Sequence, residues 1–382
     1  MRLPDVQLHL RPGIIEFGWG HPDPALLPLD DLRRAARMAF IVYGADALAY
    51  GAEQGPGSLI AELCDLLAQR GVVPPSPETI FVTAGVSHAI DLLCTLYTRP
   101  GDVALVQAPV YHLALKILRD HGLTLVPVAS DEHGLQPDAL EAALHTLAQD
   151  GQHATLLYTI PTFANPTGSV LSAERRAAVV DIAVKYGLLV LEDDVYYDLW
   201  YDTPPPPPLA AYPHEGRVVR LGSFSKIVAP GLRLGWLQAD PTIVQRCVTS
   251  GVIDSGGGIN HLTAHIATSY VRHGYLTRHI DQLRASYRTR RDTLLAALAA
   301  HLPETCQVYH PGGGFFVWLS LPEDVDSAAF RMRAEAAGVS YLSGDRFYSN
   351  EQQSNAVRLA FSLLSPADLE EGAARLGRVL SE

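Results

Sequence analysis

Residues 223–235 read Ser-Phe-Ser-Lys-Ile-Val-Ala-Pro-Gly-Leu-Arg-Leu-Gly, and this stretch decides the expected fold and chemistry. It offers one amine, two hydroxyls and one guanidinium within eleven residues, and it follows a strand-like run at 217–222. A lone lysine is most often a solvated surface residue, but Lys226 has no charged residue within five positions on either side. An amine that forms an imine with an aldehyde cofactor, beside donors for a phosphate, needs this setting.

Length and composition set the broad class of the molecule. The chain has 382 residues, of which 48% are hydrophobic and 18% charged, so a large core can form and two lobes are expected. No run of about 18 apolar residues appears, and the N-terminus lacks an apolar signal core, so we expect neither a membrane span nor secretion. The formal net charge of −12, without a dense basic stripe, argues against a nucleic-acid partner.

The cysteines indicate the compartment. The four residues, Cys64, Cys94, Cys247 and Cys306, are widely spaced and form no Cys-x-x-Cys pair. We interpret them as small buried hydrophobic residues in a reducing environment, which predicts a cytoplasmic protein.

Short apolar runs alternate with helical patterns through the middle of the chain. Strands are expected at 79–83, 102–107, 123–128, 154–159, 188–192 and 217–221. Helices are expected at 87–97, 111–121, 137–147 and 172–186, the last opened by Ser172. This alternation predicts an α/β fold whose mostly parallel sheet is covered by helices on both faces.

The two ends of the chain differ from this pattern. Residues 1–45 carry turn signals and are interpreted as an arm that includes part of a small domain. A long helical pattern begins near 275, and after it come a strand at 315–319, a helix at 326–337 and a strand at 357–361. We therefore expect a large domain over 46–275 and a small α+β domain over 276–382.

Four motifs follow the predicted strands, where open α/β sheets bind ligands. In the first, Gly85 leads into a helix at Val86 and Ser87, whose amides and hydroxyl suit a phosphate, although Gly-x-Ser is also an ordinary helix start. The second, Asn165-Pro166-Thr167-Gly168, has the residues of a turn. Its Asn165 could also donate to a phenolate oxygen.

The third motif places Asp193 at the end of an apolar strand. A buried carboxylate is costly unless it is paired, and a protonated pyridine nitrogen is a suitable partner. Tyr196, three residues on, could reach the same ring. A solvated turn is the alternative, and a metal site is disfavoured because no histidine joins the cluster. In the fourth motif, Ser223, Ser225 and Arg233 would form a phosphate cup.

Together these motifs resemble the fold-type I pyridoxal 5′-phosphate enzymes, class I/II aminotransferases. The resemblance covers nearly the whole chain, from Phe17-Gly18-Trp19-Gly20-His21-Pro22 to Val357-Arg358-Leu359-Ala360-Phe361. The forms Gly-Ser-Phe-Ser-Lys and Glu-Asp-Asp-x-Tyr are most similar to the branch of 2-aminoadipate and kynurenine aminotransferases and MocR-like regulators. The resemblance implies the aspartate aminotransferase-like fold, with a large domain of mostly parallel sheet between helices and a smaller α+β domain.

The resemblance also implies catalytic roles. Lys226 would carry pyridoxal 5′-phosphate as an imine and shuttle the proton of the reaction. Asp193 would pair with the pyridine nitrogen and keep it protonated. Asn165 and Tyr196 would bind the phenolic oxygen, and Tyr111 would stack on the ring.

Further implied roles concern the phosphate, the substrate and a partner subunit. The phosphate would be held by the Val86 amide, Ser87, Ser223, Ser225, Arg233 and Tyr50 of the partner in a homodimer. Arg358 would clamp the substrate α-carboxylate, with Asn165 and Trp19 also at the substrate. One departure is that Val86-Ser87 stands where the family often has Ser-Gln, so one phosphate contact is lost or replaced.

The leading interpretation is a transaminase that moves an α-amino group between an L-amino acid and a 2-oxo acid. A carbon–sulfur β-lyase with the same cofactor is the alternative, and a non-catalytic MocR-like effector sensor is disfavoured because residues 1–20 leave no room for a helix-turn-helix. A plain α/β binding protein would leave the lysine, carboxylate and arginine pattern unexplained. For the substrate side chain, the candidates are Trp19, the loop at 255–260, Tyr287, and Arg11 or Arg2.

Overall fold

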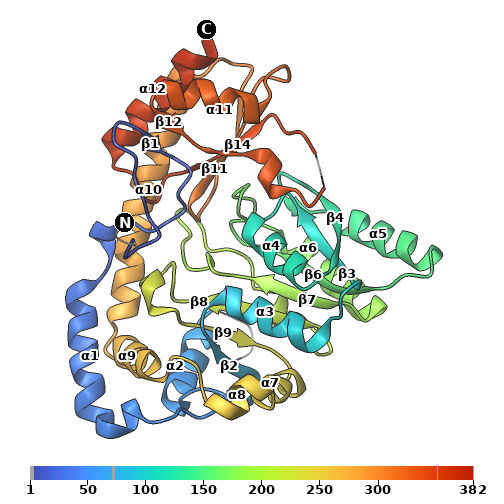
Figure 1. Ribbon diagram of the computed structural model, residues 1–382, viewed down its shortest axis with the longest axis vertical. Coiled ribbons are helices and arrows are strands. Elements are labelled where there is room, and N and C mark those ends of the chain that lie inside the picture. Colours follow the sequence, from blue (N-terminus) through green and yellow to red (C-terminus); the bar gives the residue numbers. More distant parts are fainter. Residues whose placement is uncertain (1–3, 71–73, 351, 382) are drawn as a thin grey trace.

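The computed structural model describes residues 4–70, 74–350 and 352–381 and is built around an eight-stranded sheet (Figure 1). The strand order is β2-β9-β8-β7-β6-β3-β4-β5. The strands are β2 (Ile80–Thr83), β3 (Val103–Ala108), β4 (Thr124–Asp131), β5 (Gly134–Leu135), β6 (Ala154–Thr159), β7 (Leu189–Asp193), β8 (Val218–Ser223) and β9 (Gly235–Gln238).

Most of this sheet is parallel, as the sequence predicts. The five adjacent strands β8, β7, β6, β3 and β4 run parallel to one another. The edge strand β5 is antiparallel to β4, and β9 is antiparallel to both β8 and β2. The sequence pattern missed β9, which begins with glycine and has no β-branched residue.

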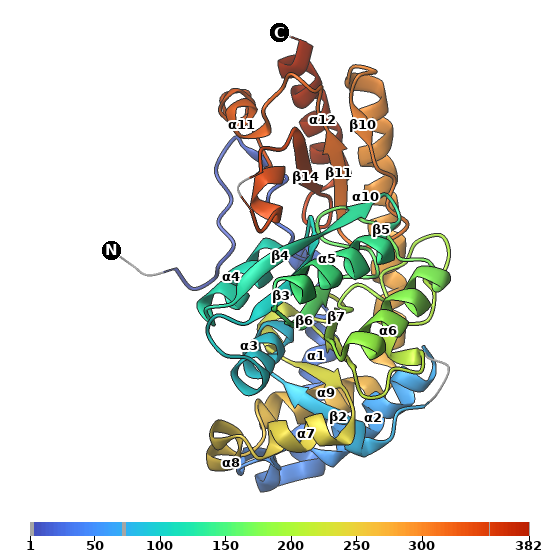
Figure 2. The same cartoon turned by 90° about the vertical axis from the view of Figure 1, so that its right-hand side faces the viewer.

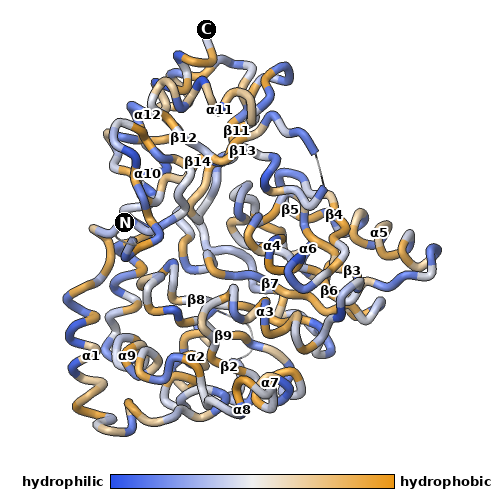
Figure 3. The backbone as a smooth tube through the Cα atoms, viewed as in Figure 1, coloured by the Kyte–Doolittle hydropathy of each residue, from blue (hydrophilic) through white to orange (hydrophobic). Residues whose placement is uncertain are grey.

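Helices cover both faces of the sheet because successive side chains of a strand point to opposite sides. On β3, Ala104 and Val106 pack toward α3 (Val86–Tyr97), α4 (His112–Asp120) and α7 (Pro241–Val248). Val103 and Leu105 pack on the other side, toward α5 (Pro137–Gln149) and α6 (Ala173–Tyr186). Figure 2 shows α3 and α4 on one side of the strands and α5 and α6 on the other, and Figure 3 shows the apolar character of the central strands.

The helix α6 shows how the sequence sets these boundaries. Ser172 caps its start by accepting a hydrogen bond from the Arg175 amide at 3.3 Å. Gly187 ends it in the left-handed conformation, with φ of 67°. The chain can therefore turn directly into β7, which delivers Asp193 to the sheet edge.

A second sheet lies in the other lobe. Its order is β10-β11-β14-β13, with all pairs antiparallel. The strands are β10 (Gln307–Val308), β11 (Phe316–Ser320), β13 (Leu342–Ser343) and β14 (Ala356–Ala360). The helices beside them are α11 (Ser327–Ala336) and α12 (Pro366–Ser381), and the long α10 (Tyr275–His301) packs along α12. Near the N-terminus, β1 (Ile15–Glu16) pairs with β12 (Val339–Ser340), so the start of the chain joins this lobe.

The interpretation of residues 1–45 as an arm missed a helix. The helix α1 (Leu29–Tyr43) packs against α9 (His261–Arg272) (Figure 1). The remaining α-helices are α2 (Gly57–Ala68) and α8 (Gly251–Gly256). The short 3-10 helices are η1 (Pro24–Leu26), η2 (Gly44–Leu48), η3 (Pro77–Thr79), η4 (Leu209–Ala211), η5 (Pro230–Leu232) and η6 (Gly344–Phe347).

Three general properties follow from the described residues. None of their helices combines the length and apolarity that crossing a membrane requires. All four cysteines are free thiols, and burial raises the pKa of Cys94 and Cys247 to about 12. Within the same residues, no group of three or more histidine, cysteine or acidic side chains could hold a metal ion.

Candidate active site

The predicted motifs meet at one edge of the large sheet. Parallel strands place their carboxyl ends side by side, and here the register pairs Thr159 of β6 with Glu192 of β7, and Asp193 with Leu221 of β8. The residues that follow these strands therefore share the edge. Asn165 comes after β6, Asp193 ends β7, and Lys226 comes after β8.

Asp193 is a buried carboxylate with one oxygen engaged and the other open. Its Oδ2 accepts a hydrogen bond from the Tyr158 hydroxyl at 2.6 Å, while its Oδ1 is buried without a partner. Burial raises the pKa of Asp193 to about 6, and the Tyr158 hydrogen bond opposes that rise. Sequence reasoning did not find Tyr158. The sequence signal that could have indicated it is a tyrosine near the end of the apolar strand β6, because the neighbouring strand β7 ends in the carboxylate of Asp193.

Lys226 is held as a partly buried amine. Its Nζ donates to the Gly20 carbonyl at 3.1 Å and lies 5.4 Å from the centre of the Phe315 ring. Burial, followed by the positive charge of Arg358, lowers the pKa of Lys226 to about 8, although Asp193 opposes the shift. The amine is therefore far more often unprotonated near neutral pH than an exposed lysine would be.

Arg358 comes from the other lobe and is buried, not part of a surface ion pair. Its Nη1 donates to Asn165 Oδ1 at 3.0 Å and its Nη2 to the Gly18 carbonyl at 2.6 Å. Its Nε is buried without a partner, and the guanidinium lies 4.2 Å from the centre of the Phe316 ring. Burial lowers the pKa of Arg358 to about 10. The cation thus keeps an open donor inside the site.

The register of three strands brings the phosphate motifs together. Gly235 of β9 lies opposite Thr83 at the end of β2 and opposite Ser223 at the end of β8. A Cβ on Gly235 would lie 2.6 Å from the Gly222 carbonyl oxygen and 2.9 Å from the Gly85 Cα. Glycine is therefore required for the start of α3 to approach the loop at Ser223.

Several donors converge beside this contact. The start of α3 has no side-chain cap, so its first amides remain available to an anion. Arg233, whose φ is +47°, donates from Nη2 to the Ala84 carbonyl at 3.0 Å. The Ser223 and Ser225 hydroxyls are 2.9 Å apart, and the Ser87 side chain is exposed at the second residue of α3. Of the predicted phosphate residues, only Tyr50 lies apart.

The aromatic candidates surround the carboxylate and the arginine. Tyr111 immediately precedes α4, and burial, together with the charge of Asp193, raises its pKa. Tyr196 is buried, with its ring centre 5.3 Å from that of Phe315, and burial raises its pKa as well. Trp19 packs edge-on against His21 at 5.1 Å between ring centres.

The other candidates are placed elsewhere. Tyr50 is 89% exposed, and none of its contacts within the described residues reaches the site. Arg11 pairs with Glu16 at 2.6 Å and with Glu335 at 3.4 Å, so it is not open to a substrate. Arg2 lies outside the described residues.

The remaining two substrate candidates lie beside different parts of the site. Tyr287 is buried on α10 with its ring centre 4.9 Å from that of Phe315. The loop at 255–260 approaches the phosphate donors instead, because Asn260 donates from its side chain to the Arg233 carbonyl.

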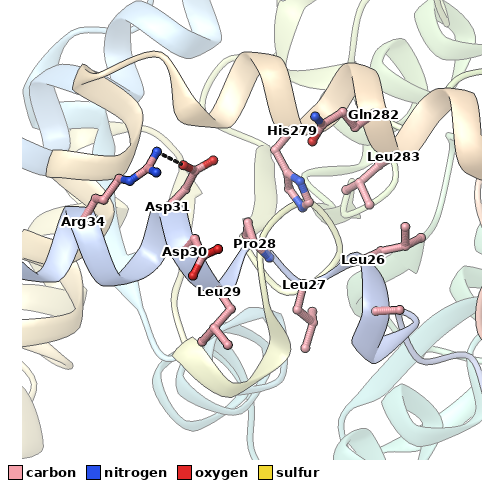
Figure 4. A pocket seen from close by; sticks show the side chains of 11 residues that line it. Leu26, Leu27, Pro28, Leu29, Asp30, Asp31, Arg34, His279, Gln282 and Leu283 are labelled. Atoms are coloured by element: carbon pink, nitrogen blue, oxygen red, sulfur yellow. Dashed lines mark hydrogen bonds and ion pairs between the residues drawn. The ribbon is translucent and has the colours of Figure 1, made fainter.

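A separate pocket of about 510 Å³ lies between the start of α1 and α10 (Figure 4). Its lining includes Leu26, Pro28, Asp31, His279 and Gln282. None of the predicted site residues lines it, so it is distinct from the site at the sheet edge.

The comparisons with known proteins identify the family. Residues 13–376 match the family model described as aminotransferase class I and II. The chain belongs to this aminotransferase family. The aromatic-amino-acid aminotransferase 1 of Thermococcus litoralis is 34% identical to it over 370 residues, which cover 97% of this chain and 88% of that protein. The 2-aminoadipate transaminase of Thermus thermophilus is 31% identical, covering 98% of this chain and 92% of that protein.

A solved aminotransferase structure has nearly the same fold. The kynurenine aminotransferase of Pyrococcus horikoshii, in complex with PMP, superposes with a TM-score of 0.92 at 34% identity, covering 97% of this chain and 91% of that one. Together the comparisons confirm the expected fold class, the transaminase activity and pyridoxal 5′-phosphate as the cofactor.

The geometry of this aminotransferase fits the cofactor. The unpaired, buried Asp193 Oδ1 is an acceptor for a ring N–H, and Lys226 offers an amine of lowered pKa. The uncapped start of α3 and Arg233 form a cradle for the phosphate.

Proposed function

We propose that this aminotransferase takes its amino group from an aromatic L-amino acid and passes it to a 2-oxo acid. The observation that carries the proposal is Arg358, a buried guanidinium with a free Nε between the faces of two aromatic rings. Its centre lies 4.2 Å from the Phe316 ring centre and 5.3 Å from that of Phe347. A cation in this position suits a carboxylate flanked by apolar and aromatic groups.

The cofactor would be held at three points. Asp193 Oδ1 would accept from the ring nitrogen, Asn165 and Tyr196 would donate to the phenolic oxygen, and Tyr111 would lie against the ring. The Val86 amide, Ser87, Ser223, Ser225 and Arg233 would bind the phosphate. Bound pyridoxal 5′-phosphate supplies the carbonyl that accepts the amino group and an electron sink for the bond that breaks at Cα.

Lys226 would move the proton at the substrate Cα. A pKa of about 8 leaves a useful fraction of its Nζ unprotonated near neutral pH, and an amine in this range can both take up and return a proton. Asp193 works in the opposite direction, since an ionised carboxylate near the amine favours the protonated form. On these grounds we propose Lys226 and Asp193 as catalytic residues. Tyr111, which would lie against the cofactor ring, is the third residue proposed to be catalytic.

The aromatic preference rests on the substrate end of the site. Arg358 donates to the carbonyl of Gly18, and Lys226 donates to the carbonyl of Gly20. Trp19 stands between these two glycines in the chain, so its backbone lies close to both side chains. Arg11, a candidate partner for a distal carboxylate, is occupied by Glu16 and Glu335. The named relatives from Thermococcus litoralis and Pyrococcus horikoshii act on aromatic amino acids or kynurenine, which supports the same class here.

A homodimer would complete the phosphate site through Tyr50 of the partner subunit. Support comes from large apolar side chains that are exposed around η2, the end of α1 and α8. They are Phe40, Ile41, Val42, Leu48, Tyr50 and Val252. Monomers rarely leave such a cluster uncovered, and Gly51 beside Tyr50 is bridged to Gly258 near the phosphate loops.

Two organisational proposals accompany the function. We propose a division near residue 275, where α10 leaves the large sheet, with the large domain over 46–275 and the small one over 276–382. A cytoplasmic location is proposed because all four cysteines are free thiols.

Substrate half-reactions test the proposed donor class. We expect the cofactor-loaded protein to convert L-phenylalanine, L-tyrosine or L-kynurenine with a kcat/KM at least about tenfold above that for L-leucine, followed by the change in cofactor absorbance. Trp19→Ala should reduce this ratio but leave the kcat/KM for L-alanine close to the wild-type value. A wild-type preference for L-2-aminoadipate or L-glutamate would contradict the aromatic assignment.

A further inference from the structure

Tyr158 is a tyrosine at a position where packing alone would favour phenylalanine. It is fully buried on β6, in the apolar cluster that contains Leu156 and Leu191. Burying a hydroxyl costs free energy unless the hydroxyl is hydrogen-bonded, and the Tyr158 hydroxyl donates to Asp193. The hydroxyl therefore contributes to the fold through Asp193 and not through the packing of the ring.

The hydrogen bond makes the two oxygens of Asp193 differ, because Tyr158 occupies Oδ2 and leaves Oδ1 open. Oδ2 is 2.6 Å from the Tyr158 hydroxyl, in the range of a charge-assisted bond to an ionised carboxylate. Oδ1 is buried and has no partner. Tyr158 thus stabilises the ionised form of Asp193 and fixes which oxygen stays open.

We propose that Tyr158 is a positioning residue that keeps Asp193 ionised and turned so that Oδ1 accepts the ring N–H of bound pyridoxal 5′-phosphate. This inference rests on the proposed role of Asp193 at the ring nitrogen. Tyr158 acts on the cofactor through Asp193 and needs no contact with the cofactor itself.

The other groups that face Asp193 do not replace Tyr158. The titratable groups are Asp194 on the same strand end, Lys226 after β8, Tyr111 before α4, and Tyr196 after β7. A backbone hydrogen bond from Val195 and the charge of Lys226 favour the ionised carboxylate, but burial, which has the largest effect, and Asp194 disfavour it. With the pKa of Asp193 already at about 6, loss of the Tyr158 hydrogen bond would raise it further, so that the carboxyl takes up a proton near neutral pH.

Cofactor affinity measures this effect without turnover. The dissociation constants of pyridoxal 5′-phosphate, and of its carbocyclic analogue with C–H in place of the ring nitrogen, are measured from pH 5.5 to 8.5 for wild type and Tyr158→Phe. At pH 7 we expect Tyr158→Phe to weaken pyridoxal 5′-phosphate binding about tenfold, as for loss of a hydrogen bond to a charged group, and to leave the analogue unchanged. The pH at which affinity is lost on acidification should also move upward. The free ligand takes up protons in the same way in both measurements, so its titration cancels in the ratio of the dissociation constants of Tyr158→Phe and wild type.

Two controls isolate the hydrogen bond from packing. Tyr341→Phe removes an equally buried hydroxyl in the small lobe, which donates to the Ser327 carbonyl at 2.7 Å, and should leave both affinities unchanged. In an Asp193→Asn background, Tyr158→Phe should add no further change in the preference for pyridoxal 5′-phosphate over the analogue.

Each contrary result points to one assignment. If Tyr158→Phe weakens both ligands equally, or leaves the preference and its pH dependence as in wild type, the positioning role is overturned while the cofactor site stands. If the wild-type protein does not prefer pyridoxal 5′-phosphate to the analogue, the proposed role of Asp193 is overturned as well.

Discussion

At the scale of single residues, burial shifts the pKa values of Lys226 and Asp193 in opposite directions. Burial lowers the pKa of the amine and raises the pKa of the carboxylate. The amine gains reactivity from this shift, whereas the carboxylate would lose its charge without a donor. The Tyr158 hydroxyl supplies that donor.

Lys226→Met tests the amine directly, since methionine has a similar length and no nitrogen. We expect the absorbance of the covalently attached cofactor to disappear and turnover to fall by at least about a thousandfold, because an activated nucleophile and base is removed. Absorbance spectra and single-turnover kinetics measure both effects. Retention of the wild-type spectrum would rule out Lys226 as the attachment point.

The same variant should stabilise the cofactor-free protein. The pKa of Lys226 is about 8 in the folded protein and 10.5 as the ordinary value, so the unfolded chain holds the proton more strongly. The penalty for burying the charged amine is complete below about pH 8, shrinks as the pH rises and is gone above about 10.5. Lys226→Met should therefore unfold at higher denaturant concentration than wild type at pH 7, with a smaller difference at pH 10. A difference that does not change with pH would contradict this account.

Sequence reasoning found the residues whose chemistry is visible in their type and position, and missed those that depend on register. Asp193 and Lys226 stand next to recognisable strands, so their place at the sheet edge was predictable. Tyr158 was not predictable as a partner of Asp193, because the contact depends on how β6 pairs with β7. The Gly18 and Gly20 carbonyls were missed for a related reason, since a backbone acceptor leaves no mark in the sequence.

At the scale of elements, β9 is the strand that brings the residues of the proposed phosphate site together. It pairs with β2 on one side and β8 on the other, and Gly235 lies at the point where all three meet. The sequence of β9, Gly-Trp-Leu-Gln, begins with glycine and has no β-branched residue, so it lacks the pattern that predicts a strand. The helix α1 was missed for a different reason, since the turn signals before it, such as Pro22 and Pro24, led the whole of residues 1–45 to be interpreted as an arm.

Gly235→Ala should separate these strands. The new Cβ would lie 2.6 Å from the Gly222 carbonyl oxygen and 2.9 Å from the Gly85 Cα, both of them backbone atoms that cannot rotate away. We expect a loss of about 2 kcal/mol in the free energy of unfolding, and weaker binding of inorganic phosphate and of the cofactor. Chemical denaturation and ligand titration measure the two effects.

Gly231→Ala is the matched control for this element. Gly231 lies in η5, shortly before β9, and a Cβ there would meet nothing within 4 Å. Its variant should retain the wild-type stability and affinity. Equal behaviour of the two variants would show that the close approach at Gly235 does not hold the site together.

At the scale of the whole molecule, the exposed apolar side chains around η2 and α8 are the feature on which the proposed homodimer rests. Val252→Glu and Leu48→Glu place charges at 78% and 69% exposed positions in this cluster. The proposed homodimer predicts that each variant shifts the protein toward monomer and lowers cofactor affinity, because the proposed contact from the partner subunit would be lost. Analytical ultracentrifugation as a function of concentration measures the shift.

Met332→Glu serves as the control for added charge. Met332 is 72% exposed on α11, away from the cluster. Its variant should keep the association state of the wild type. A wild-type protein that sediments as a monomer with full cofactor affinity would refute the proposed role of the partner.

The long reach of Arg358 has a consequence for the order in which the protein matures during synthesis. Its two hydrogen bonds join residues that are 193 and 340 positions apart in the chain. A chain growing from its N-terminus on the ribosome completes the edge with Asp193 and Lys226 well before Arg358 has been made. The residues proposed to hold the cofactor ring and phosphate within this chain are thus all synthesised before the residue proposed to bind the substrate carboxylate.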